Sequence, residues 1–210
     1  MFQGTSLILF LTASLALIVT PGPDMIYVVT RGVAQGRAAG LVSVWGACSG
    51  LIVHTMLASV GLSALLRSSA AAFMVVKYAG AVYLISLGIK AFLGRENFSV
   101  AREPAPTLKL GKVFFQGLAS NLLNPKIALF FLAFLPQFVS LASGNAALHM
   151  LILGLVFTTL ALLVFNVIAY YSGALGNWLG KKPGFANDLR WLTGSVLVGL
   201  GLRLALPEKA

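Results

Sequence analysis

A hydrophobic segment near the N-terminus is interrupted by Pro21, Gly22, Pro23 and Asp24, and apolar sequence resumes at Met25. Proline cannot donate the backbone hydrogen bond that a helix requires, and it leaves a carbonyl oxygen unpaired. Hydrocarbon offers no water to these groups, so such a break is tolerated only where it packs inside protein or lines a cavity. The interruption therefore indicates a substrate site within a membrane protein.

Composition supports a membrane location for the whole chain. Of its 210 residues, 59% are hydrophobic and only 10% are charged, which leaves too little polar surface for a soluble globule. The first segment has neither a basic beginning nor a small-residue cleavage site, so we interpret it as a retained span instead of a signal peptide. The sequence thus predicts an all-α polytopic membrane protein.

Hydropathy predicts six transmembrane helices, since each apolar segment reaches the roughly 20 residues that cross a hydrocarbon core about 30 Å thick. They lie near 5–30, 41–66, 71–93, 112–138, 146–173 and 189–206. The polar stretch from Arg95 to Lys112 separates three spans from three. We therefore expect a first three-helix repeat at 1–94, a cytoplasmic linker at 95–111 and a second three-helix repeat at 112–210.

The distribution of basic residues predicts the orientation. Ten Lys and Arg residues follow spans one, three and five, against four on the opposite side. Short cytoplasmic loops are enriched in Lys and Arg, so both termini should face the outside of the membrane. The same bias accounts for the net charge of +10, which therefore does not indicate nucleic-acid binding.

An odd number of spans in each half makes the second half enter the membrane from the opposite side, so the two repeats should be inverted. Span one is broken at Pro21 to Asp24, and span four, its equivalent, is broken at Asn124, Pro125 and Lys126. Paired interruptions at matching places point to the binding site of a transporter. Sequence identity between the halves is not visible, so the predicted repeat depends on hydropathy and the two breaks.

The local sequence of each break predicts what it binds. Gly22 or Thr20 can cap a new helix with proline in its first turn, and Asn124 followed by Pro125 has the pattern of an N-cap and a first helical residue. The N-terminal end of a helix carries partial positive charge and attracts a carboxylate. Both breaks should therefore present anion-binding helix ends at membrane depth.

Two charged side chains accompany the breaks, Asp24 and Lys126. An isolated charge at the bilayer centre costs at least about 2.5–3.5 kcal/mol, and such residues commonly mark function. One anionic and one cationic group together suit a zwitterion, with Asp24 taking an ammonium group or a proton and Lys126 taking a carboxylate. A structural ion pair between the two residues is the alternative.

Four motifs carry a resemblance to a known family. They are residues 21–24 (Pro-Gly-Pro-Asp), 77–84 (Lys-Tyr-Ala-Gly-Ala-Val-Tyr-Leu) with Leu87 and Gly88, 120–126 (Ser-Asn-Leu-Leu-Asn-Pro-Lys) and 134–138 (Phe-Leu-Pro-Gln-Phe). Together they resemble the LysE/RhtB family of amino-acid exporters over nearly the entire chain, least in 95–112 and in span five. The resemblance implies a bacterial inner-membrane protein that uses the proton motive force to expel amino acids such as threonine, homoserine, leucine or basic ones. With the Lys and Arg bias, it places both termini in the periplasm as an expectation.

Other polar residues within the spans are secondary candidates. His54 could belong to a proton path or contact substrate, or it could form an interhelical hydrogen bond. Asn121, next to the second break, could bind substrate or orient Lys126. Tyr78 and Tyr83 could reach a cavity, although tyrosine is commoner at the membrane interface or in helix packing.

Other function classes stay open beside an amino-acid transporter. Cys48 is the only cysteine, which disfavours a thiol-redox carrier, and with the distant His54 and His149 it has no metal-ligand spacing. The sequence shows no acid-base cluster for a membrane-embedded enzyme, and we expect no cofactor. A passive channel would differ from a transporter in lacking ion coupling.

Glycine spacing bears on assembly. Gly32, Gly36 and Gly40 recur every four residues, as do Gly46 and Gly50, and such spacing permits close helix approach. This pattern predicts tight packing and allows a homodimer.

Overall fold

The computed structural model describes residues 4–62, 69–93, 107–139, 145–172 and 183–206. The helices in chain order are α1 (Gly4–Val19), α2 (Pro23–Gln35), α3 (Arg37–Leu57), η1 (Ala58–Leu62), α5 (Ala70–Leu93), α6 (Leu110–Leu122), α7 (Pro125–Leu129), η2 (Phe130–Phe134), η3 (Leu135–Phe138), α8 (Ala146–Tyr170) and α10 (Pro183–Ala205). No strand occurs in these ranges. The predicted all-α class is therefore confirmed.

Both predicted breaks are bends between two helices. The chain turns by 50° between α1 and α2 and by 47° between α6 and the helical run that starts with α7. Gly22 is the extended N-cap of α2, followed by Pro23, and Asn124 is the N-cap of α7, followed by Pro125. The capping pattern expected from the sequence is present at both places.

Three unbroken helical segments are long and apolar enough to cross a membrane, and the total is five if each bent pair forms one span. The unbroken segments are Arg37–Gly61, Met74–Leu93 and Ala146–Tyr170. The apolar part of α10, Gly194–Ala205, is shorter, because α10 begins with several polar residues. The protein is a multi-pass helical membrane protein, and the sixth span stays a prediction.

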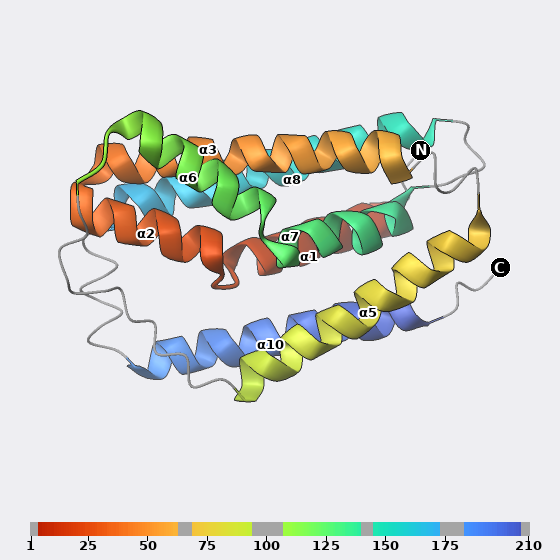
Figure 1. The fold of residues 1–210 in the computed structure, drawn as a ribbon. Helices are drawn as coiled ribbons and strands as arrows, with labels where there is room; N and C mark the ends of the chain where they lie inside the picture. Colours follow the sequence, from red (N-terminus) through yellow and green to blue (C-terminus); the bar gives the residue numbers. More distant parts are fainter. Residues whose placement is uncertain (1–3, 63–68, 94–106, 140–144, 173–182, 207–210) are drawn as a thin grey trace.

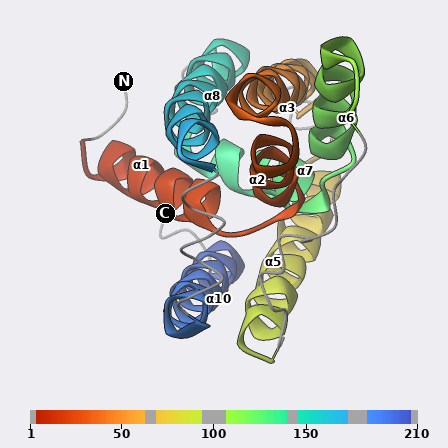
Figure 2. The same cartoon turned by 90° about the vertical axis from the view of Figure 1, so that its left-hand side faces the viewer.

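The helices form two groups with the breaks between them. Viewed end-on in Figure 2, α2, α3, α6 and α8 lie together, while α5 and α10 form a separate pair. Helix α1 packs on both α8 and α10, and α5 packs on α7 and η2. The segments nearest the two breaks therefore lie in the centre of the molecule.

Direction along the bundle alternates as expected for a polytopic protein. Figure 1 shows the beginning of α1 and the end of α10 at one end of the bundle, with the α2–α3 turn and the beginning of α6 at the other. Gly36 makes that turn with a φ of 86°, and a Cβ there would meet open space. Gly36 is thus a turn residue, and the prediction that it permits close approach of two helices is wrong.

The other glycines at four-residue spacing do pack closely, but they pack against helices of the same chain. A Cβ on Gly40 would lie 3.2 Å from the Cα of Gly32, and one on Gly50 would lie 2.6 Å from Oδ1 of Asn121 on α6. Gly46 likewise faces the α6 backbone at Phe114. Because these glycines serve contacts inside the chain, they lend no support to the predicted homodimer.

Candidate functional site

Asp24 connects the first break to the second. Its Oδ2 accepts hydrogen bonds from Nδ2 of Asn121 (2.7 Å) and Nδ2 of Asn124 (3.0 Å), and its Oδ1 accepts one from Oγ of Ser120 (3.2 Å). The side chain is buried in the first turn of α2, where the positive helix end favours an anion. Three donors thus compensate the carboxylate for the water it has lost.

Lys126 makes the reverse connection, from the second break to the first. Its Nζ donates to the carbonyl oxygens of Thr20 (3.1 Å) and Leu17 (3.3 Å) at the C-terminal end of α1. These carbonyls lack helical partners because α1 ends before the break, and the end of a helix attracts a cation. A Cβ on Gly22 would lie 2.9 Å from Nζ, so the absence of a side chain there lets the backbone approach the ammonium group.

Each charge therefore has its own set of neutral partners. Asp24 depends on side chains around the second break, and Lys126 depends on main-chain oxygens of the first. An ammonium group has three N–H donors, so Lys126 keeps one beyond its two carbonyl bonds. Among the described residues, the two charges are thus held by neutral groups and form no ion pair with each other.

Asp24 and Lys126 line one cavity, together with Thr20, Gly22 and Asn121. The remaining lining residues are apolar and come from α1, α2, α3, α7 and α8: Leu17, Ile18, Met25, Leu51, Ile127, Phe157, Ala161 and Phe165. The space open to the centre of a water molecule is about 10 Å³, which holds about one water. A molecule larger than water therefore requires the helices around the two charges to separate.

Asn121 and Asn124 support Asp24 in different ways. Asn124 uses its Nδ2 on Asp24 and its Oδ1 to accept from the N–H of Lys126 at 3.0 Å, so one side chain caps α7 and holds the carboxylate. Asn121 also donates to Asp24, but its buried Oδ1 has no hydrogen-bond partner among the described residues. That oxygen is an acceptor that an incoming N–H group could satisfy.

The remaining predicted site residues shape the site from outside the cavity lining. Pro21 precedes the Gly22 N-cap, and Pro23 and Pro125 are the first residues of α2 and α7. Nε2 of His54 lies 3.3 Å from the carbonyl oxygen of Asn121, and its ring is 5.9 Å from that of Phe131. Of the three roles considered for His54, a proton path, a substrate contact and an interhelical hydrogen bond, this geometry supports the last.

Sequence reasoning missed several members of the site. The sequence analysis named Ser120 only as part of a family motif. The carbonyl oxygens of Leu17 and Thr20 belong to the main chain, so their role does not depend on residue type and cannot be recognised from the sequence. Phe157 and Phe165 lie eight residues apart on α8, a helical spacing. Since α8 is apolar on every side, the spacing alone could not show which face lines the cavity.

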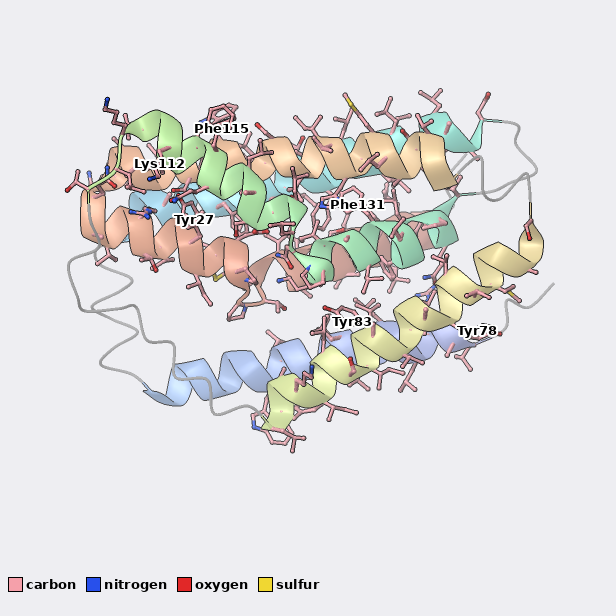
Figure 3. All side chains as sticks on the ribbon, viewed as in Figure 1. Tyr27, Tyr78, Tyr83, Lys112, Phe115 and Phe131 are labelled. Atoms are coloured by element: carbon pink, nitrogen blue, oxygen red, sulfur yellow. The ribbon has the colours of Figure 1, made fainter. Side chains whose placement is uncertain are left out.

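A group of polar contacts, called the polar seam below, joins Tyr27 and Arg31 of α2 to Val113 and Gln116 of α6. Oη of Tyr27 lies 3.0 Å from the carbonyl oxygen of Val113 and 3.2 Å from Oε1 of Gln116, and that same oxygen accepts from Nη2 of Arg31 at 3.2 Å. Figure 3 shows Tyr27 on the side of the bundle where Lys112 lies, in the first turn of α6. The seam joins the two helices beyond Asp24, between the cavity and that end of the bundle.

The similarity of this chain to known proteins extends over both breaks. A family model described as LysE type translocator matches residues 15–208. The chain is 33% identical to the uncharacterized membrane protein YrhP of Bacillus subtilis, over 96% of this chain and 99% of that protein. It is 31% identical to the leucine efflux protein of Enterobacter sp. (93% of each chain) and 28% identical to that of Salmonella typhimurium (93% and 92%). No solved structure matches the chain.

Proposed function

The chain belongs to the LysE type translocator family, and we propose that it is a secondary transporter that exports amino acids from the cytoplasm. Membership of a translocator family makes it a transporter, not an enzyme. Relatives of nearly equal length are named leucine efflux proteins, which supports amino acids as the substrates. The observation that carries the proposal is the cavity at the paired breaks, lined by one carboxylate and one ammonium group.

The two charges match the two ends of an α-amino acid. Asp24, with its Oδ atoms held by neutral donors, would take the substrate ammonium group, and the unpaired Oδ1 of Asn121 would accept another of its N–H bonds. Lys126 would take the substrate carboxylate with its remaining donor. Asn124 would act as a positioning residue, since it holds both Asp24 and the start of α7.

We also propose that six spans form two inverted three-helix repeats. The bent pair α1–α2 would correspond to α6–α7, α3 to α8, and α5 to α10. In support, α3 packs on α8 and α5 packs on α10, as helices related by a two-fold axis through the centre would. Figure 1 also shows α1–α2 and α6–α7 running in opposite directions along the bundle. The repeats would span 1–94 and 112–210, with 95–111 between them.

The Lys and Arg bias supports a bacterial inner-membrane location with both termini in the periplasm and the 95–111 linker in the cytoplasm. Single cysteines labelled from outside intact cells test this orientation. A reactive probe in the linker together with unreactive probes at both termini would reverse it.

Export against a gradient requires an ion, and we propose antiport with a proton carried by Asp24. Each charge moved across a potential of 100 mV supplies about 2.3 kcal/mol. The test is purified protein in liposomes, with exchange and pH-driven accumulation measured for a panel of labelled amino acids. Exchange of no amino acid would overturn the proposed function, and exchange that a pH gradient cannot drive would favour the passive channel.

A further inference from the structure

We propose that the apolar wall of the cavity selects neutral aliphatic amino acids, and that Ala161 on α8 determines how long a side chain the site accepts. This inference rests on the proposed function and names the substrate class of the same site. It assigns to α8, a helix without a break, the part of the site that recognises the variable portion of the substrate.

The charges of the cavity are fully used by the main-chain groups of an amino acid. Of the described residues that line it, only Asp24 and Lys126 are ionisable. A substrate with a further charge on its side chain would place that charge beside the apolar lining residues, where an unpaired ion is strongly disfavoured. Lysine, arginine, aspartate and glutamate should therefore be poor substrates.

The wall surrounds the space on several sides. Leu17 and Ile18 belong to α1, Met25 to α2, Leu51 to α3 and Ile127 to α7, all on the cavity that the α8 residues complete. The substrate side chain, which extends away from the ammonium and carboxylate groups, would therefore meet apolar residues from every helix that lines the site. Burial of each methylene in such surroundings contributes about 0.8 kcal/mol.

Ala161 is the smallest of the three α8 residues that line the cavity. It lies one helical turn from both Phe157 and Phe165, and all three line the cavity. The ring of Phe157 is fully buried, with centroids 5.0 Å from Phe130 and 5.4 Å from Phe131, so packing holds it in place. Between two large rings, Ala161 presents only a methyl group, so a change of size there alters directly how far a substrate side chain could reach once the helices separate.

Opposite size changes at Ala161 test the inference. Wild-type protein in liposomes is compared with Ala161→Gly and Ala161→Val, with labelled alanine, leucine, phenylalanine and lysine as the probes. Because one methylene in an apolar pocket changes discrimination by about 10–200-fold, we expect Ala161→Val to shift the alanine-to-leucine ratio of kcat/KM at least about tenfold toward alanine. Ala161→Gly should shift the phenylalanine-to-leucine ratio toward phenylalanine.

Val167→Leu is the matched control, since it enlarges a side chain on the exposed side of the same helix and should leave all ratios unchanged. A variant that merely folds poorly lowers every substrate equally and leaves the ratios as they were. Equal loss for all substrates in both Ala161 variants, or lysine exchanged as fast as leucine by the wild type, overturns the inference while the proposed function stands. Exchange of no amino acid by the wild type instead overturns the proposed function.

Discussion

The two proline breaks occupy corresponding places in the chain but contribute opposite chemistry. The first break supplies an anion, Asp24, and two main-chain acceptors at the end of α1, and its N-cap Gly22 has no side chain to form a cap. The second supplies a cation, Lys126, and two amide donors, and its N-cap Asn124 closes the new helix with its own Oδ1. Each break therefore provides what the other lacks.

This difference shows why the two halves could not be identical repeats around one site. Two copies of the first break would bring two carboxylates together, and two copies of the second would bring two ammonium groups together. Like charges at short range repel, and the effect is strong where water is scarce. In the proposed inverted arrangement, divergence at the breaks would allow a site between the two repeats to bind an asymmetric, doubly charged molecule.

Loss of the cation at the second break should have the largest effect. Lys126→Met keeps most of the volume but removes the charge, which leaves the carbonyls of Leu17 and Thr20 without their donor and the substrate carboxylate without a partner. Truncation of one member of a buried charge pair costs about 2–5 kcal/mol, so substrate binding should weaken at least about 30-fold. Calorimetric titration of the purified protein with leucine measures this loss.

The control for that measurement is the variant with both charges neutralised, Asp24→Asn with Lys126→Met. If the two residues only neutralise each other, the double change removes both charges together and should restore folded yield and transport. A double variant that accumulates amino acids against a gradient as the wild type does means that neither residue binds substrate or carries the proton.

Neutralisation of the first break alone should separate binding from coupling. An asparagine at position 24 can turn its Oδ1 toward the donors on Asn121 and Asn124 and its Nδ2 toward Ser120 Oγ, which also accepts. Asp24→Asn should therefore keep the fold and still exchange substrate, at lower affinity because the substrate ammonium group loses its anionic partner. It should lose accumulation driven by a pH gradient, because an amide cannot release a proton. Undiminished proton-driven accumulation by this variant would place the coupling proton elsewhere.

The contact that aligns the second break with α3 predicts a smaller effect. Gly50→Ala would place a Cβ 2.6 Å from Oδ1 and 2.8 Å from Cβ of Asn121, so α3 and α6 must shift and the hold on Asp24 must loosen. Overpacking of this kind costs about 1–3 kcal/mol. Thermal unfolding of the purified protein should show the loss, together with slower exchange. Gly61→Ala, where a Cβ meets open space, is the matched control and should behave as the wild type.

Much of this site was predictable because proline, glycine and charge are rare and costly in hydrocarbon. Pro21, Pro125, Asp24 and Lys126 identify the breaks from the sequence alone, and Asn124 before Pro125 identifies a cap. The partners of Lys126 were not predictable, since any residue type supplies a main-chain carbonyl.

Two further features depended on information that the sequence pattern does not contain. Ala161 stands in a helix that is apolar all round, so only packing can show that it lines the cavity. Glycine spacing was misleading at Gly36, where the residue permits a positive φ in a turn instead of close helix contact. Sequence periodicity shows which residues lie on the same face of a helix. It does not show which helix or cavity that face contacts.

The smallest effect should come from the seam that joins the two broken spans beyond the site. Tyr27→Phe keeps the ring but removes the hydroxyl group that lies between Val113 and Gln116. Side-chain hydrogen bonds between membrane helices contribute about 0.6 kcal/mol on average, so we expect a change of no more than about threefold in the exchange rate and no change in leucine affinity. Tyr171→Phe, at an exposed tyrosine, is the control. Because Tyr27 lies on α2 about one turn from Asp24 but outside the cavity lining, a loss of affinity as large as that of Lys126→Met would mean that substrate is bound by the seam as well as by the breaks.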